Sequence, residues 1–423
     1  MFSDDNENLR HNFIVNTLDG GFFGLGVGFA SFVTIIPLFV SQMTDSAILI
    51  GLIPAIHAMG WQLPQLLTVE HVTRLSRYKP MVVFMTGQER LPYLGLAILA
   101  WILPGVDRQV ALVVTFALLI WQGLGAGFTA TAWQSMIGKI MPPRRVGTFF
   151  GIQSAAANLF ASGGALGAGI FLERLAAPLN FALCFLVASV AMGVSWFFLA
   201  QTREPSKPPL AAASDASPFW SRMKTILRRD ANFRWFLIAR MLAQLAIMAI
   251  SFYTVYAVRH YGMSGFTAGV MTAVLAATQI VASPMMGWVG DHWGHRAAMQ
   301  VGALAASGSA LLAMLAPGIE WFYPAFILAG IANVAAWTIA MAMTLEFNTG
   351  AERPAYIGLA NTLIAPSTFI APLLGGWLAD TAGFQATFLV SVIGGLATAL
   401  VLYAALRDPR QARRAGGATV GPE

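Results

Sequence analysis

The chain has 423 residues, of which 57% are hydrophobic and only 10% are charged. Soluble domains carry about 25% charged residues, so this composition excludes a mostly water-facing surface. Lys and Arg outnumber Asp and Glu by 25 to 19, but the excess lies in short segments between apolar runs, which favours membrane topology over nucleic-acid binding. The single cysteine, Cys184, excludes an intrachain disulfide and a cysteine-based metal site.

Apolar runs long enough to cross a bilayer recur along nearly the whole chain. A hydrocarbon core about 30 Å thick needs about 20 apolar residues per helix. We therefore predict an all-α membrane protein with twelve transmembrane helices. The predicted spans are 13–41, 47–69, 81–104, 109–136, 148–172, 180–200, 233–258, 266–288, 297–316, 320–345, 356–379 and 385–405. The first run is too long for a signal peptide and has no obvious cleavage site, so we expect it to be retained.

The distribution of Lys and Arg between the spans predicts the orientation, because positive charge concentrates in cytoplasmic loops. With the N-terminus inside, the outer loops hold only Arg108, Arg174 and Arg259, whereas most other basic residues lie on the inner side. We therefore expect a multi-pass protein of the plasma membrane, the inner membrane of a bacterium, with both termini in the cytoplasm.

One long connection divides the chain. Residues 202–232 contain Pro205, Pro208 and Pro209, then an Ala/Ser stretch, then the basic segment SRMKTILRRD. This pattern predicts a cytoplasmic linker between an N-terminal six-helix bundle at 1–201 and a C-terminal one at 233–406, followed by a cytoplasmic tail at 407–423. The basic segment is either a short helix on anionic headgroups or part of a solvated linker.

Weak sequence matches recur in the same order on both sides of this linker. The matched pairs are Ser31-Phe32-Val33-Thr34 with Ser251-Phe252-Tyr253-Thr254, Gly51 with Gly269, Ala132-Trp133 with Ala336-Trp337, and Gly151 and Gly169 with Gly358 and Gly376. Together they indicate two pseudo-symmetric six-helix halves in parallel orientation, one of the repeat types that transporters use. The substrate path is then expected between the halves.

Between spans 8 and 9 the chain reads GWVGDHWGHR. We name this segment the gating loop; its candidate residues are Gly287, Asp291, Gly294, His295 and Arg296. Glycines permit a tight turn and close helix approach, and a carboxylate can accept from helix N-termini or basic groups. The segment resembles the loop signature of the major facilitator superfamily, G-x-x-x-D-x-x-G followed by basic residues. The resemblance covers residues 13–405 and implies the superfamily fold, with this loop locking the cytoplasmic face.

The corresponding segment of the first half reads VEHVTRLSRYKP, and we name it the first-half loop. It keeps the basic residues Arg77 and Lys79, but Val69 and Thr73 stand where the signature has glycine and aspartate. The first-half lock is therefore either altered or replaced by Glu70. Span 4 reads LIWQGLGAG, similar to a superfamily segment R-x-x-Q-G-x-G-x-G, with Leu119 in place of the arginine of many proton-coupled members. This departure weakens a proton-antiport interpretation.

Four charged residues lie inside predicted spans and form a charge layer: Asp19, Glu89, Arg90 and Arg240. At 1.5 Å per residue they lie at similar depths, roughly 9 to 14 Å from the cytoplasmic entry points. Such groups normally face a partner or a water-filled cavity. We expect Asp19 to pair with Arg90 in its own half or with Arg240 in the other. A fixed ion pair, an inner gate, and substrate or proton binding all remain open as roles.

Polar residues nearer the midplane are candidates for substrate binding. The superfamily lines its cavity with spans 1, 4, 7 and 10, which favours Gln122, Gln244, Asn333 and Trp337, and His57 is a further candidate. Hydrogen bonding between helices is the alternative role for each of them.

No enzymatic or cofactor chemistry is indicated. The GLGVG and GLGAG runs lie in mid-span rather than after a soluble strand, and no paired-histidine metal spacing occurs. We therefore predict no catalytic residues, no cofactor and no metal. The predicted function is secondary transport of a small, neutral or amphipathic molecule by rocker-switch alternating access, with efflux as one direction, a proton or sodium ion as candidate coupling ion, and a monomeric protein in the lipid bilayer. The alternative is a non-transporting membrane receptor or assembly factor of the same fold.

Overall fold

The computed structural model describes residues 2–44, 46–206, 219–263, 265–348, 350 and 352–409. The contacts divide the chain into two compact units. Unit 1 comprises Met1–Met141, Ala156–Ser214 and Ile357–Thr362, and unit 2 comprises Pro142–Ala155, Asp215–Tyr356 and Leu363–Glu423. Each unit therefore contains a short piece of a helix whose remainder belongs to the other unit.

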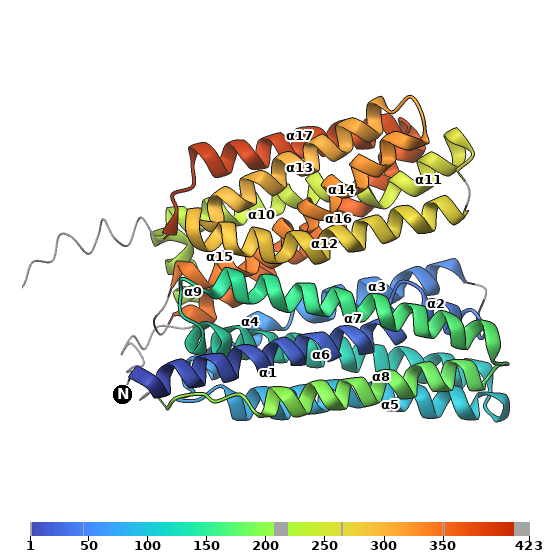
Figure 1. Ribbon diagram of the computed structural model, residues 1–423, viewed down its shortest axis with the longest axis horizontal. Helices are drawn as coiled ribbons and strands as arrows, with labels where there is room; N and C mark the ends of the chain where they lie inside the picture. Colours follow the sequence, from blue (N-terminus) through green and yellow to red (C-terminus); the bar gives the residue numbers. More distant parts are fainter. Residues whose placement is uncertain are drawn as a thin grey trace, which may run out of the picture. The chain divides into compact units, whose positions relative to one another are not determined.

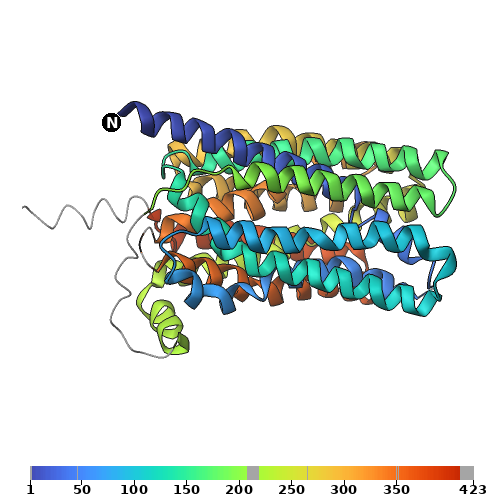
Figure 2. The same ribbon diagram turned by 90° about the horizontal axis from the view of Figure 1, so that it is seen from below.

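Unit 1 is a bundle of roughly parallel helices (Figure 1). Its elements are α1 (Phe2–Phe29), α2 (Ile35–Val40), α3 (Ala47–Gln62), α4 (Gln65–Thr73), α5 (Lys79–Ile102), η1 (Leu103–Gly105), α6 (Arg108–Ile140), the greater part of α7 (Val146–Arg174) and α8 (Leu179–Ala200). Helix α8 packs against α1 and α5, and α6 packs against α3 and α5. The turned view in Figure 2 likewise places α5 beside α8.

Unit 2 repeats this arrangement. Its elements are α9 (Phe219–Arg229), α10 (Ala231–Ile247), α11 (Ile250–Tyr261), α12 (Gly265–Trp293), α13 (His295–Leu315), η2 (Ile319–Trp321), α14 (Phe322–Val334), the π-helix η3 (Ala335–Ile339), α15 (Ala340–Phe347), α16 (Arg353–Thr381) and α17 (Phe384–Ala404). Helix α17 packs against α10 and α13, and α14 packs against α12 and α13. The same neighbour pattern in both units confirms the predicted six-helix repeat.

Within the described residues, nine helical segments are long and apolar enough to cross a membrane. They cover the predicted spans 4 to 12. The first three predicted spans coincide with α1 and α2, with α3 and α4, and with α5. These segments are broken or carry charge: α3 has only 16 residues, and α5 contains Glu89 and Arg90. The described chain is helical throughout and contains no strand, which confirms the predicted fold class.

Two helices differ in extent from the predicted spans. Helix α1 begins at Phe2, before the predicted span 13–41, and Asn12 in this extension donates from its amide nitrogen to the carbonyl oxygen of Arg203 at 2.8 Å. The predicted span 47–69 is broken at Leu63 and Pro64, since proline lacks the backbone N–H that continues a helix. The basic segment of the predicted linker forms the helix α9, as one of its two predicted alternatives has it, and Met223 and Ile226 on it are buried.

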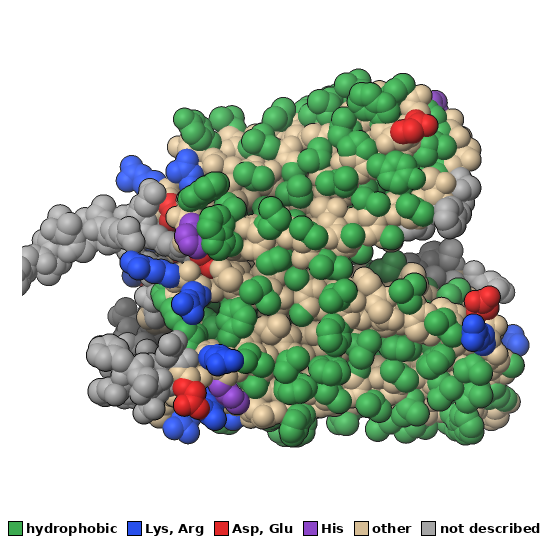
Figure 3. Space-filling model, viewed as in Figure 1, with side chains coloured by type: hydrophobic (Ala, Val, Ile, Leu, Met, Phe, Trp, Pro, Cys, Tyr) green, Lys and Arg blue, Asp and Glu red, His purple; other side chains and the backbone are tan. Residues whose placement is uncertain are grey.

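Apolar side chains fill the interior and also cover the flank of each unit. The core of unit 1 includes Phe39 and Phe185, and that of unit 2 includes Tyr253 and Phe388. Figure 3 shows hydrophobic side chains over the long flank of each unit, with Lys and Arg mainly at one end of each. Exposed apolar surface of this extent marks an interaction surface, and lipid is the partner that long apolar helices require. Residues 207–218 of the predicted linker and 410–423 of the predicted tail lie outside the described residues.

Candidate gating and substrate sites

The gating loop caps a helix. Asp291 lies in the last turn of α12, and its two carboxylate oxygens accept hydrogen bonds from the backbone N–H groups of Gly147 at 3.0 Å and Thr148 at 2.6 Å. These groups belong to the first turn of α7, where N–H groups have no partner within the helix and carry partial positive charge. The Asp291 side chain is only 1% exposed. The structure thus contains the helix-terminus contact that the motif predicts.

The two glycines of the signature have different structural roles. A Cβ atom at Gly287 would collide with the carbonyl oxygen of Gly147, so glycine lets the backbones of α12 and α7 approach closely. Gly287 lies inside a helix and forms no turn, contrary to one part of the expectation. The turn is at Gly294, whose φ of 100° is in the region that favours glycine and which precedes α13.

The basic residues of the gating loop have different partners. His295 is fully buried, with Nδ1 at 2.7 Å from Oε1 of Glu346 and Nε2 at 3.8 Å from Oδ1 of Asp291. Arg296 instead donates to the carbonyl oxygen of Tyr403 at 2.6 Å, which ties the start of α13 to α17. Glu346, at the end of α15, was not predicted. In the sequence Glu346 stands out only as an acidic residue at the end of span 10, and no local pattern indicates that it contacts His295.

The first-half loop is built differently. Val69 on α4 is buried, and its side chain occupies the space where a Cβ at Gly358 would lie. Gly358 belongs to the six residues of α16 that are part of unit 1. Glu70 pairs with Arg74, the residue that directly follows this helix, at 2.5 Å, and Thr73 donates to the carbonyl oxygen of Glu70 at 2.9 Å. Of the two predicted alternatives, an altered first-half contact fits this geometry and replacement by Glu70 does not.

Three members of the charge layer lie in unit 1. The guanidinium of Arg90 donates to Oδ1 of Asp19 at 3.1 Å and to the carbonyl oxygen of Met192 at 3.1 Å. Ser195 on α8 donates to the same Asp19 oxygen at 2.6 Å. Of the two expected pairings, Asp19 therefore forms the one with Arg90. Arg240 is buried on α10 of unit 2, with its guanidinium 5.7 Å from the ring centre of Phe236.

Gln122 forms hydrogen bonds with two other candidate residues of unit 1. Its Oε1 lies 3.0 Å from Nδ1 of His57, and its Nε2 donates to Oε1 of Glu89 at 3.4 Å. His57 also stacks on Phe32, with ring centres 4.0 Å apart. The result is a polar chain of His57, Gln122 and Glu89 that runs from α3 through α6 to α5.

The glycines of the span 4 segment explain this geometry. A Cβ at Gly123 would lie 3.1 Å from the carbonyl oxygen of Ile56, and one at Gly127 would collide with that of Gly60. A Cβ at Gly125 would lie 3.2 Å from Cα of Glu89. Small residues thus bring α3 and α5 close to α6, as packed membrane helices require. Leu119, which replaces the superfamily arginine, is buried in the apolar core of unit 1.

The unit 2 candidates are not joined in this way. Gln244 is buried on α10, and Asn333 and Trp337 are half-buried on α14 and η3. Among the described residues no hydrogen bond links these three to one another. Trp337 lies within the π-helix, a feature that often marks a functional site. Its neighbour Thr338 shares a hydrogen bond of 3.0 Å with Ser154 of α7, and the sequence carries no signal for this local change of helix type.

The comparisons agree with this fold. The family model described as Major Facilitator Superfamily matches residues 236–421. The structure of the fucose:proton symporter FucP of E. coli has a TM-score of 0.76 at 14% identity, covering 93% of this chain and 98% of that one. The proton:xylose symporter XylE has a TM-score of 0.73 at 15% identity, covering 96% and 97%. The family model covers less than half of the chain, and the structural matches show that the chain has the fold of the major facilitator superfamily.

Two relatives have shorter matches. Multidrug resistance protein 1 of Bacillus subtilis is 28% identical over 150 residues, which are 35% of this chain and 38% of that protein. Multidrug resistance protein 2 of the same organism is 29% identical over 136 residues, 32% of this chain and 34% of that protein. The matched region thus spans little more than a third of each relative.

Proposed function

We propose that this protein is a secondary transporter that exports a small amphipathic molecule by rocker-switch alternating access. The observation that carries the proposal is the capping of α7 by Asp291. Residues Val146–Ala155 of this helix belong to unit 2 and the remainder to unit 1. Hydrogen bonds to a charged group contribute about 1.5 to 3 kcal/mol each, so two of them form a contact that can be broken and remade in every transport cycle.

The polar chain of unit 1 supports an amphipathic substrate. His57 and Gln122 provide buried hydrogen-bonding groups, and Phe32 provides an aromatic face beside them. A few polar groups within apolar walls are typical of small-molecule sites. We include Gln244, Asn333 and Trp337 of unit 2 as further binding residues. The names of the two multidrug resistance proteins support efflux as the direction.

We propose Glu89 as the carrier of a coupling proton, with a sodium ion as the alternative. Glu89 is buried and accepts from Gln122, and among the described residues it has no salt bridge. A carboxylate in such a position can change its protonation when a bound molecule alters its surroundings. We place the protein in the plasma membrane as a monomer with both termini in the cytoplasm, because the basic residues gather on the inner side of the predicted spans.

Transport into proteoliposomes tests this proposal. The purified protein is reconstituted with an imposed proton or sodium gradient, and the uptake of a panel of cationic and neutral fluorescent dyes is measured. We expect gradient-driven accumulation of some dyes, a large loss in Gln122→Ala, and normal uptake in the control Gln109→Ala, which alters an exposed residue near the start of the same helix. In Glu89→Gln we expect dyes to equilibrate but not to accumulate.

A second function follows from the first-half loop, which lacks the signature glycine and aspartate. A receptor or assembly factor need not open and close, and among the described residues Glu70 of α4 pairs only with Arg74, the residue that directly follows this helix. If every dye fails to move under either gradient although some bind, this alternative replaces transport. Cysteine labelling in α1 and α10 then distinguishes the two functions, since labelling that does not change on ligand binding contradicts alternating access.

A further inference from the structure

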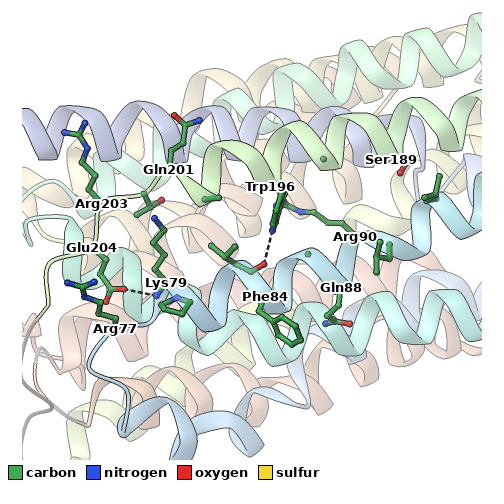
Figure 4. Close-up of a pocket in the computed structure, with 18 residues that line it drawn as sticks. Arg77, Lys79, Phe84, Gln88, Arg90, Ser189, Trp196, Gln201, Arg203 and Glu204 are labelled. Atoms are coloured by element: carbon green, nitrogen blue, oxygen red, sulfur yellow. Dashed lines mark hydrogen bonds between the residues drawn. The ribbon is translucent and has the colours of Figure 1, made fainter.

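A groove runs along the surface of unit 1 between α5 and α8 (Figure 4). Its volume is about 1110 Å³. One end is basic, formed by Arg77, Lys79 and Arg203, and the remainder is mostly apolar. None of its residues belongs to the polar chain or to the gating loop, although it shares Arg90 with the charge layer and Arg77 and Lys79 with the first-half loop.

Of the three basic residues, Arg203 has an acidic partner, the exposed Glu7, at 3.9 Å. Among the described residues, neither Arg77 nor Lys79 has a carboxylate within salt-bridge distance. Glu204, the one carboxylate that lines the groove, is 1% exposed and already occupied. It accepts from Nζ of Lys139 at 2.6 Å and from the backbone N–H groups of Tyr78 and Lys79 at 3.0 and 2.7 Å. Arg77 and Lys79 therefore offer uncompensated positive charge to an anion.

The apolar part has the form of a trough. Phe84, Leu91 and Leu94 present exposed side chains along it, and Phe84 is 72% exposed. Gly193 leaves one side open, because a Cβ added there would meet no atom within 4 Å. Trp196, at the centre of Figure 4, donates from Nε1 to the carbonyl oxygen of Val83 at 2.9 Å, which fixes its indole ring as a wall.

An unsatisfied polar atom lies at the inner wall. The side chain of Arg90 lines the groove and is 8% exposed, and its Nε has no hydrogen-bond partner, although its two terminal nitrogens bond Asp19 and Met192. Buried donors are normally satisfied.

We propose that the groove binds an anionic phospholipid of the bilayer, with its phosphate on Arg77, Lys79 and Arg203 and an acyl chain in the trough past Gly193. The charge of the basic end and the apolar trough match the two parts of such a lipid. From Lys79 to Leu91 the helix rises about 18 Å at 1.5 Å per residue, close to half of a hydrocarbon core about 30 Å thick. The groove therefore spans one leaflet. This binding does not depend on transport, because it concerns the outer surface of one unit.

Native mass spectrometry of the purified protein tests the proposal. Dioleoyl phosphatidylglycerol, dioleoyl phosphatidylcholine and glycerol phosphate are titrated separately, and bound adducts are counted. We expect phosphatidylglycerol to bind at concentrations about tenfold lower than phosphatidylcholine, which has the same acyl chains, and glycerol phosphate, which has none, to bind far more weakly.

Variants locate the site. The double variant Arg77→Ala, Lys79→Ala should weaken phosphatidylglycerol binding about tenfold, whereas Arg74→Ala, on the same first-half loop but outside the groove, should not. Gly193→Leu should fill the trough and weaken binding without lowering the thermal stability, because its side chain enters open space. Gly169→Leu, a second glycine with open space around it but outside the groove, is the matched control.

Three results would overturn the proposal. Equal binding of the two phospholipids removes the role of the charged headgroup. If Gly193→Leu binds phosphatidylglycerol as tightly as the wild-type protein does, the trough has no role in binding. Binding of glycerol phosphate as tightly as phosphatidylglycerol shows a simple anion site without a lipid chain. Because Gly193→Leu leaves the basic residues intact, it remains informative even if the double variant is poorly folded.

Discussion

The gating loop and the first-half loop occupy equivalent positions in the repeat but form different contacts. On α12, Gly287 has no side chain and lies against the backbone of Gly147, and Asp291 caps α7. In the first-half loop the arrangement is reversed: the side chain of Val69 on α4 fills the contact, and the glycine, Gly358, lies on the facing helix α16. Both pairs of helices approach closely, but only the gating loop adds a charged cap.

Close approach of two helices and capping of a helix N-terminus are therefore separate features. Apolar contact between Val69 and Gly358 depends on shape and needs no charge. The contact of Asp291 depends on two hydrogen bonds and on the partial positive charge of a helix N-terminus. The proposed gate is therefore asymmetric. The gating loop is held by polar groups that can exchange partners, and the first-half loop is held by apolar packing.

His295 extends the polar side further. Its Nδ1 contacts Glu346 at 2.7 Å, so the cap is connected through a buried ring to the end of α15. No equivalent of this connection occurs among the described contacts of Glu70 or Thr73. Four mutational tests separate the polar contribution from the packing contribution.

The largest effect is expected for Asp291→Ala. The substitution removes two hydrogen bonds to a charged acceptor and leaves two N–H groups of α7 unsatisfied, so we expect a loss of about 3 kcal/mol of stability. Hydrogen exchange at the Gly147 and Thr148 amides should accelerate by more than tenfold. Asp380→Ala, which alters an exposed carboxylate of the same unit, is the control and should change neither quantity. Unchanged exchange at the two amides would show that the cap contributes nothing to the closed end of α7.

Gly287→Ala should cost about 2 kcal/mol, because a Cβ that collides with a backbone oxygen forces two helices apart. Gly376→Ala on α16 is the matched control, since its Cβ would lie 3.9 Å from Cζ of Phe252, an ordinary van der Waals distance. A glycine replaced without a clash in a helix gains about 0.5 to 1 kcal/mol, so the two variants should shift unfolding in mixed detergent micelles in opposite directions. Shifts of the same sign would contradict the role of Gly287 in close approach.

How far the sequence predicts these contacts depends on their range. The turn at Gly294 could be predicted because it follows from local backbone geometry. The motif indicated that Asp291 would accept from a helix N-terminus or a basic group, but it did not identify α7, whose Gly147 and Thr148 are more than 140 residues away in the sequence. The partner Glu346 could not be found in this way, since 51 residues separate it from His295. The pairing of Asp19 was open between two arginines for the same reason. The π-helix at Trp337 and the exchange of helix segments between the units depend on packing of the whole chain and have no local signal.

The apolar packing of the first-half loop is tested by a double-mutant cycle on Val69 and Gly358. Gly358→Ala alone should cost about 1 to 2 kcal/mol, because its Cβ meets the Val69 side chain. Val69→Ala alone should cost about 2 kcal/mol through lost packing. Together they should cost less than the sum by about 1 kcal/mol, since the smaller side chain makes room for the new Cβ. The control pair replaces Val69→Ala by Val72→Ala, another buried valine of α4, and should be additive.

The smallest effect is expected for Glu70→Gln. Glu70 is 46% exposed and pairs with Arg74 one turn away. Exposed pairs of this spacing contribute about 0.3 to 0.5 kcal/mol, and salt screens them, so the variant should lose no more than this and the loss should disappear at high ionic strength. Asp291→Asn, an equivalent exchange of a carboxylate for an amide in the gating loop, should lose several times as much at any salt concentration, because its side chain is buried. A loss in Glu70→Gln that equals the loss in Asp291→Asn would mean that Glu70 holds a second cap, and the asymmetry between the two loops would then be one of residue position alone.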